Sequence, residues 1–300
     1  MSEPKNHHYV PQCLIKQFKN KTNTYYLYDV KRNNFYTTLS SKSTFSEIGL
    51  NTILDENGNK NNTSIEKELN DNFEKEFAKN LKIVKDLIFD FEHQPIEKFE
   101  NLDFINALYY LIKLGLIGDF RNPNKLKNTD DAINSMFNDI YPISTEDLKN
   151  EIDALREVRT STKYNSHSDF VELANGIIKN MGEHVLSVLI APESDYFILP
   201  DCQSSYTRKV LEDDIILDGM VLKSSCNVIC WLGYPIDSKT FITIESKKIS
   251  KRKQNSILRI DSASTFFINL QLYNSSYKSI LCEDDDYLKK FVEKLNTNCI

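Results

Sequence analysis

The residues whose types could do chemistry begin near the amino terminus, where the string HHYVPQ (residues 7–12) places two of the five histidines side by side. Imidazole ligates metals, transfers protons near neutral pH and contacts phosphate. Successive side chains of an extended segment point to opposite faces, so one of His7 and His8 would line a site while the other packs. We predict that Tyr9 and Gln12 contribute to binding there. The alternatives are a buried structural strap and an exposed terminal pair.

A second candidate group lies late in the chain. Asp201 follows Pro200, and Glu245 and Lys247 stand two residues apart in a β-type run. Many metal-dependent nucleases hold one cation with an Asp and a Glu while a Lys on the same strand polarises the attacked phosphate. Glu245 and Lys247 would share one face of a strand. Asp201 and Glu245 are therefore candidate ligands of a divalent cation such as magnesium; the alternative is a surface strand that carries charges.

The stretch after Glu245 is locally basic, since five of the seven residues 247–253 are Lys or Arg. Such a cluster can contact the phosphates of nucleic acid. We predict Lys247, Lys251, Arg252 and Lys253 as binding residues, and the alternative is a solvated loop.

The composition limits the function classes. The chain has 300 residues with 37 Lys or Arg and 43 Asp or Glu, a net charge of −6, which argues against an electrostatic grip on nucleic acid over the whole chain. No apolar run approaches the roughly 18 residues that span a membrane, and the opening MSEPKNHHYV lacks the profile of a secretory signal. We expect a soluble cytoplasmic protein without a membrane partner. No glycine-rich nucleotide-binding motif occurs.

The order of elements predicts an α+β fold: an N-terminal β-hairpin, a central helical block, and a small C-terminal antiparallel sheet with terminal helices. We expect one integrated unit with three parts, residues 1–63, 64–190 and 191–300. The apolar run 104–120 should form a central helix that ends at Arg121-Asn122-Pro123. Further predictions are long helices over 170–190 and 264–281 and short strands over 196–199, 227–232, 240–245 and 256–260.

The opening HHYVPQCLIKQF resembles that of a family of uncharacterised, mainly bacterial proteins, known only as a domain of unknown function. The Tyr-rich hairpin TYYLYDVKRNNFY, the acidic helix positions Glu66 and Glu74, and Arg121-Asn122-Pro123 are also similar to that family. Cys13 stands where the family has an aromatic residue. The resemblance implies that His7, His8, Arg121 and Asp201 converge, although they lie far apart in the chain.

These residues lead to two functional hypotheses. Two histidines, an arginine and carboxylates suit a phosphoryl group or a divalent metal, so we expect a phosphodiester-directed hydrolase, a metal-dependent nuclease that acts as a defence or toxin effector. In this hypothesis His7, His8, Arg121 and Asp201 are catalytic. The alternative is a non-catalytic regulatory module of a mobile-element or defence system that binds a ligand, a nucleic acid or a protein partner.

Overall fold

A long apolar helix, α4 (Leu102–Arg121), stands at the centre of the structure, a computed structural model that describes residues 6–54, 57–90, 99–160, 169–217 and 220–297. The helix begins where the Asn101 side chain accepts a hydrogen bond from the Phe104 backbone N–H (3.0 Å), and it ends before Pro123. Five of its leucine and isoleucine side chains have no exposed surface: Leu108, Leu111, Ile112, Leu114 and Ile117. The predicted central helix is thus confirmed.

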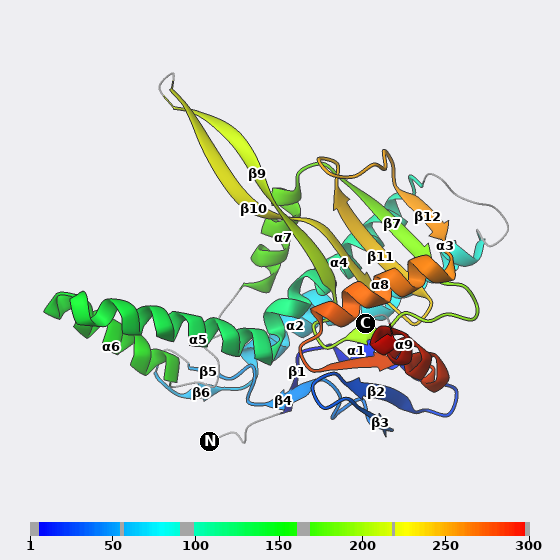
Figure 1. The fold of residues 1–300 in the computed structure, drawn as a ribbon, viewed down its shortest axis with the longest axis horizontal. Helices are drawn as coiled ribbons and strands as arrows, with labels where there is room; N and C mark the ends of the chain where they lie inside the picture. The colour runs from blue at the N-terminus through cyan, green and yellow to red at the C-terminus, as the bar shows by residue number, and fades with distance from the viewer. Residues whose placement is uncertain (1–5, 55–56, 91–98, 161–168, 218–219, 298–300) are drawn as a thin grey trace.

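The other helices lie around α4 and the two main sheets, except α5 and α6, which extend away from them (Figure 1). Their bounds are α1 Gln12–Ile15, α2 Ser64–Leu69, α3 Phe77–Asp90, α5 Pro123–Ile140, α6 Glu146–Thr160, α7 Phe170–Met181, α8 Ser262–Ser275 and α9 Asp285–Thr297. Three shorter turns are η1 (Lys16–Phe18), the π-helical η2 (Asn70–Glu74) and η3 (Tyr141–Ile143).

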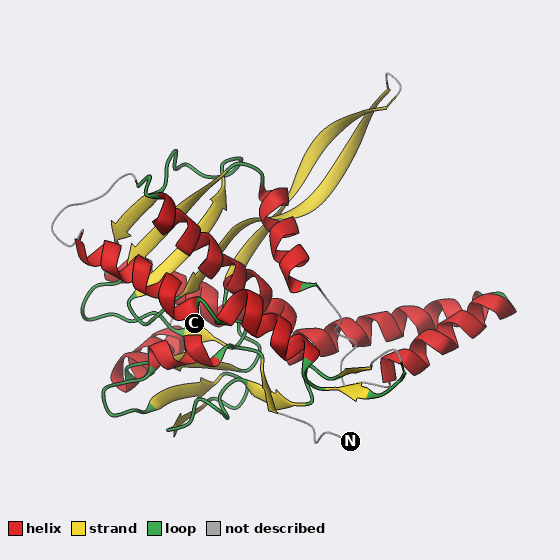
Figure 2. Ribbon diagram, turned by 180° about the vertical axis from the view of Figure 1, so that it is seen from behind, coloured by secondary structure: helices red, strands yellow, loops and turns green. Residues whose placement is uncertain are grey.

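A five-stranded sheet with the order β12-β7-β11-β10-β9 forms the larger β layer. Its strands are β7 His184–Ile190, β9 Ser205–Leu217, β10 Met220–Pro235, β11 Thr240–Ser246 and β12 Ser256–Arg259. All pairings are antiparallel except that of β12 with β7. α4 and α7 pack against one face, as seen from behind in Figure 2, and α8 lies on the other face, in front in Figure 1.

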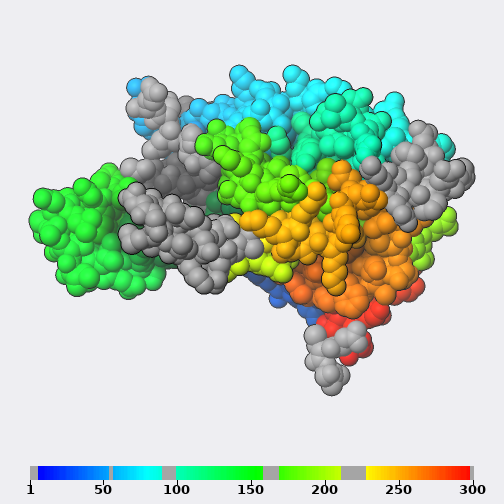
Figure 3. Space-filling view, turned by 90° about the horizontal axis from the view of Figure 1, so that it is seen from above, coloured from blue at the N-terminus to red at the C-terminus, as the bar shows by residue number. Residues whose placement is uncertain are grey.

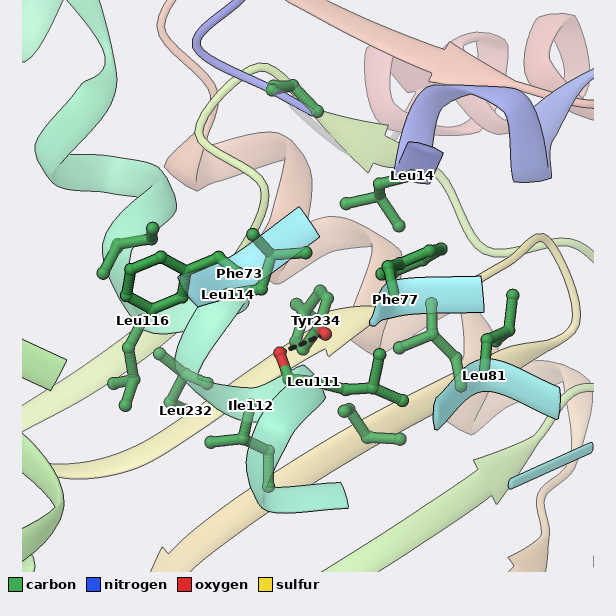
Figure 4. Close-up of a cluster of buried hydrophobic side chains, with 14 of the residues drawn as sticks. Leu14, Phe73, Phe77, Leu81, Leu111, Ile112, Leu114, Leu116, Leu232 and Tyr234 are labelled. Carbon is green, nitrogen blue, oxygen red and sulfur yellow. Dashed lines mark hydrogen bonds between the residues drawn. The ribbon is translucent and has the colours of Figure 1, made fainter. Parts of the chain in front are cut away.

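The contact between α4 and the sheet is close because a glycine lies where an aromatic ring packs (Figure 4). A Cβ atom built on Gly115 would come within 2.4 Å of the Tyr234 ring. The Tyr234 hydroxyl donates a hydrogen bond to the Leu111 carbonyl, so this fully buried side chain keeps its polar atom satisfied. Leu14, Phe73, Phe77 and Leu81 extend the same core toward the amino terminus.

A second sheet joins the two ends of the chain, in the order β3-β2-β13-β8. Its strands are β2 Tyr25–Asp29, β3 Asn34–Thr38, β8 Leu199–Pro200 and β13 Ser279–Cys282. The N-terminal hairpin therefore pairs with a strand from the last part of the sequence, and α9 packs against β2 and β13. Two small ribbons complete the strands: β1 Asn6–His8 with β4 Ser46–Ile48, and β5 Ile53–Leu54 with β6 Lys60–Asn61.

Two extensions project from this body. The helices α5 and α6 form one arm, and the β9–β10 hairpin forms another (Figure 1). The helical arm is the green mass at one end of the space-filling view in Figure 3. No helix in the described parts of the chain combines the length and apolar character needed to cross a membrane.

The predicted α+β architecture is confirmed, while two predicted helices are shorter than expected. The helix expected over 170–190 ends at Met181, because Gly182 adopts a positive φ of 67° and the chain continues as β7. The helix expected over 264–281 ends at Ser275, and its last residues belong to β13.

Candidate functional site

The N-terminal segment is an ordered strand that is held by pairing with another part of the chain. β1 pairs antiparallel with β4, and the Tyr9 N–H donates to the Phe45 carbonyl (3.0 Å). Val10 has no exposed surface and Tyr9 has 8 %. Pro11 then precedes α1 and directs the chain into it. These contacts hold the two histidines in place, which a free chain terminus would not do.

The two imidazoles have different surroundings, as expected for neighbours in a strand. His7 is 1 % exposed, and its Nδ1 accepts a hydrogen bond from the Asn51 backbone N–H (2.9 Å). His8 is half-buried; its Nε2 lies 3.1 Å from the Ser41 carbonyl, and its Nδ1 lies 3.5 Å from the Gln12 amide nitrogen. A carbonyl only accepts, so the Ser41 contact places the His8 proton on Nε2 and leaves the lone pair on Nδ1.

Arg121, the last residue of α4, connects this strand to the helical block. Its side chain is 1 % exposed, and its Nη2 donates to the His8 carbonyl (2.5 Å). Its Nη1 lies 3.7 Å from Glu74 Oε1, at the end of the π-helical turn η2. Among the described residues, Nε and Nη1 have no hydrogen-bond partner. A buried guanidinium with unsatisfied donors is costly, so its pairing with Glu74 and His8 is a specific feature of this position.

Two carboxylates complete the group that we call the His8 cluster: His7, His8, Asn51, Glu66, Glu74 and Arg121. The Asn51 side chain donates to Glu66 Oε1 (2.5 Å), which links His7 to Glu66 through one residue. Burial lowers the pKa of His8; nearby Arg121 adds to this effect and Glu66 opposes it. Burial raises the pKa of Glu74, against the influence of Arg121. His8 is thereby favoured in its neutral form and Glu74 in its protonated form.

Cys13, beside this cluster, is not an activated nucleophile. Burial, and secondly Glu74, raise the pKa of its thiol to about 12. A thiol attacks as the thiolate, so Cys13 stays unreactive near neutral pH.

Asp201 is fully buried and its carboxylate is engaged by backbone. Its oxygens accept hydrogen bonds from the N–H groups of Tyr277 (2.8 Å), Lys278 (2.9 Å) and Ser279 (3.4 Å). Burial raises the pKa of this carboxyl to about 6, although the three donors act in the opposite direction. These contacts make Asp201 an organiser of the loop that enters β13.

The end of α4 does bring the predicted residues together, through backbone atoms. Arg121 binds the carbonyl of His8, and the next residue, Asn122, donates its side-chain amide to the carbonyl of Asp201 (2.9 Å). Burial raises the pKa of the Tyr9 hydroxyl, and the Asp201 carboxylate raises it further. The hydrogen bonds of the His8 imidazole go to the neutral groups of Ser41 and Gln12.

The second predicted group is divided between two places. Glu245 lies on β11 in the five-stranded sheet, and its Oε2 accepts a hydrogen bond from the Ser250 hydroxyl (2.6 Å). Asp201 follows β8 of the other sheet, where backbone N–H groups hold its carboxylate. Within the described residues, no group of three or more His, Cys, Asp or Glu side chains is arranged to hold a metal ion. A shared cation stays a prediction.

The basic residues predicted to bind nucleic acid also lie in different surroundings. Lys247 forms an ion pair with Glu183 (3.2 Å), and Lys253 is exposed. Lys251 and Arg252 lie at a cleft on the sheet that also includes Glu245. The Arg252 Nη1 donates to the Ser187 hydroxyl (2.6 Å), which fixes part of its side chain.

Sequence reasoning missed some polar residues that the fold brings together. Asn51 and Ser41 come from loops without a distinctive motif, so only the tertiary structure reveals their contacts with His7 and His8. A further network surrounds Asp119 on α4, whose carboxylate binds Lys125, Tyr206 and Tyr277. The sequence signal that could have revealed this network was Asp119 itself, a charged residue in the last turn of a mainly apolar helix.

These observations define an α+β protein in which a buried N-terminal strand carries two histidines to the end of a central helix. The chain belongs to the family described as protein of unknown function (DUF4238), whose model matches residues 6–286. No curated protein and no solved structure matches the chain.

Proposed function

We propose that this protein is a phosphodiester-directed hydrolase in which His8 acts as the proton-transfer group. The observation that carries the proposal is the arrangement of His8: its Nε2 faces the Ser41 carbonyl, while its main-chain carbonyl binds the buried Arg121. An imidazole held in one orientation, on a strand that the buried Arg121 connects to the half-buried Glu74, is suited to general acid–base chemistry.

His8 would act as the base through Nδ1. The Ser41 contact holds the proton on Nε2, and the 3.5 Å separation between Nδ1 and the Gln12 amide is too long for a strong hydrogen bond. The lone pair can therefore accept a proton from an attacking water. Because burial lowers the pKa of His8, the neutral form needed for this step persists below pH 6.5.

Glu74 would act as the acid. Its side chain is 26 % exposed, and burial raises its pKa above 4.5, which favours the protonated form. In the proposed step a water oxygen bonds to phosphorus while Nδ1 of His8 takes the water proton. The P–O bond to the leaving group breaks, and Glu74 gives that oxygen a proton. Arg121 is a positioning residue, because its buried side chain holds both partners.

The phosphodiester part of the proposal is supported by Lys251 and Arg252, which line the cleft on the five-stranded sheet. A nuclease role, nucleic acid as partner, dependence on a cation such as magnesium, and action in defence or as a toxin belong to the same proposal. So do a cytoplasmic location, a bacterial origin and the HHYVPQ string as a hallmark of the family.

A second function is favoured by one observation. The Asp201 carboxylate accepts three backbone N–H groups, which suits a structural role. On this alternative the protein is a non-catalytic module that binds nucleic acid, a ligand or a protein.

The test is cleavage of end-labelled single-stranded RNA and DNA by the full chain, with magnesium and with a chelator. His8→Ala should lower the cleavage rate by roughly 10²–10⁴-fold, the usual share of general acid–base catalysis. His184→Ala is the matched control, since this histidine contacts Tyr109 and Gly182 outside the His8 cluster, and it should cleave as the wild type does. Equal rates for His8→Ala and wild type would contradict the proposal. Binding without cleavage under every condition would support the alternative.

The pH profile supplies an independent readout. His8 works as a base only when deprotonated, so the acidic decline in rate should lie below pH 6.5. Glu74 works as an acid only when protonated, so the alkaline decline should lie above pH 4.5. Glu74→Gln should remove the alkaline decline and leave the acidic one, which loss of a purely structural residue would not do.

A further inference from the structure

A cleft of about 630 Å³ opens on the face of the five-stranded sheet that carries α8. Strand residues form its floor, α8 forms one wall, and the loop between β11 and β12 forms the other. Figure 3 shows this loop and α8 side by side, in lighter and deeper orange. Its size is in the range of sites for small molecules or single nucleotides.

The floor of the cleft is an aromatic platform held in one orientation. Trp231 lies nearly parallel to Phe241, with an angle of 23° between the rings and 6.4 Å between their centres. Gly233 makes this packing fit, because a Cβ atom there would come within 2.4 Å of the Phe241 ring and 2.8 Å of Trp231. The Phe241 ring therefore supports the Trp231 indole, which lines the cleft.

The wall from α8 offers a second aromatic ring. Phe267 is 64 % exposed and lines the same cleft. Because it lines the cleft beside Trp231, this exposed ring is available to stack on a flat ligand. Thr207, Thr243 and Gln271 add polar groups around the two rings.

The cleft carries positive charges on its loop and a negative charge on its strand floor. Lys251 and Arg252 stand on the loop, where Arg252 is steadied by Ser187. Glu245 stands on the strand, directly opposite Trp231 in the β10–β11 pairing, and Ser250 binds one of its oxygens. The cations of Lys251 and Arg252 suit a phosphate group. The Glu245 carboxylate, beside the Trp231 ring, suits the edge of a base that carries N–H donors.

We propose that this cleft binds one unpaired base of a single-stranded nucleic acid, guanine in preference to adenine. The base stacks on Trp231 and Phe267, and its phosphate contacts Lys251 and Arg252. Glu245 accepts hydrogen bonds from the N–H groups on the Watson–Crick edge of guanine, which presents two adjacent donors. The inference rests on the proposed function in that it names the substrate class, but it uses a site other than the His8 cluster.

The single tryptophan makes the test direct, because Trp231 is the only source of indole fluorescence. The chain carrying His8→Ala, in which cleavage should be strongly slowed, is titrated with single-stranded oligonucleotides of alternating G and U or alternating A and U, and with a duplex. We expect quenching of the Trp231 fluorescence and tighter binding of the G-containing strand than of the others. Equal affinity for the duplex, or binding without quenching, would overturn the inference.

Variants assign the contacts. Phe267→Ala should weaken binding by about 5- to 150-fold, the range for loss of one base-stacking contact. Phe89→Ala is the matched control, since Phe89 is 71 % exposed on α3, and it should bind as tightly as the parent. Glu245→Gln should reduce the preference for guanine over adenine, and Lys251→Gln should weaken binding to both strands. Unchanged binding by Phe267→Ala would contradict the proposal.

The outcome is separable from that of the proposed function. Cleavage by the wild type with no binding signal at Trp231 would remove this inference alone. Binding at Trp231 with no cleavage by any form would remove the hydrolase and keep the cleft.

Discussion

The His8 cluster and the sheet cleft place polar and charged residues in opposite environments. In the cluster, Arg121 is 2 % exposed and His7 is 1 % exposed, and each is held by other parts of the chain. At the cleft, Phe267 is 64 % exposed and Lys251 is exposed. A buried charge must be paired within the protein, whereas an exposed side chain is available to a ligand.

The comparison indicates which property each region controls. Substitutions in the cluster should lower the free energy of unfolding as well as activity, because the same contacts position the strand. Substitutions at the cleft rim should change binding and leave the fold stable, because few atoms there are removed from water.

Arg121→Ala should have the largest effect. It leaves Glu74 and the His8 carbonyl without their buried partner, so we expect a loss of roughly 3–5 kcal/mol in the free energy of unfolding measured by urea denaturation. Arg32→Ala is the control, because the Arg32 side chain is 80 % exposed and pairs only loosely with Asp29; this change should cost about 1 kcal/mol or less. A small loss for Arg121→Ala would remove the distinction between the two regions.

Leu111→Ala gives the apolar benchmark for the same helix. The side chain has no exposed surface, so we expect a loss of roughly 2–5 kcal/mol, the range for buried leucines. Thermal and urea unfolding of the variant measure it. A loss below this range would mean that α4 is not the centre of the core.

Asp201→Asn tests the structural role of that carboxylate. The new NH₂ group would face backbone N–H donors and replace one acceptor, which should cost roughly 1–3 kcal/mol. Asp131→Asn, at an exposed position of α5, is the control for a change of charge alone. If Asp201→Asn kept full stability but abolished cleavage, Asp201 would belong to the catalytic site after all.

Phe267→Ala should have the smallest effect on stability, within about 0.5 kcal/mol, because most of this ring is already in water. Its effect should be confined to nucleic-acid binding. A clear drop in melting temperature would show that Phe267 is a packing residue and would weaken the case for the cleft.

The sequence predicted the central helix for physical reasons that are local, whereas the convergence at its end was implied only by the family resemblance. The apolar run of α4 has one stable location, and Pro123 marks where it stops. β7 was not predicted, although Gly182 followed by HVLSVLI carries the signal of a helix end and a strand. The pairing of β2 with β13 joins segments about 250 residues apart, and no local pattern encodes such a contact.

The candidate site could be predicted only in part for the same reason. His8 and Arg121 were recognisable by type, but their contact runs through the His8 carbonyl, which every residue possesses. The cleft depends on Trp231, Gly233 and Phe267, whose positions around one cavity follow from strand register and from the placement of α8. Of the basic residues predicted to bind, only Lys251 and Arg252 line the cleft.

The most direct test of the account measures binding and single-turnover cleavage of one labelled single strand by His8→Ala and by Phe267→Ala. We predict that His8→Ala keeps the affinity of the wild type and loses roughly 10²-fold or more in cleavage rate. Phe267→Ala should lose affinity, yet cleave at the wild-type rate once saturated. Wild-type cleavage by His8→Ala would contradict the central claim that His8 transfers the proton.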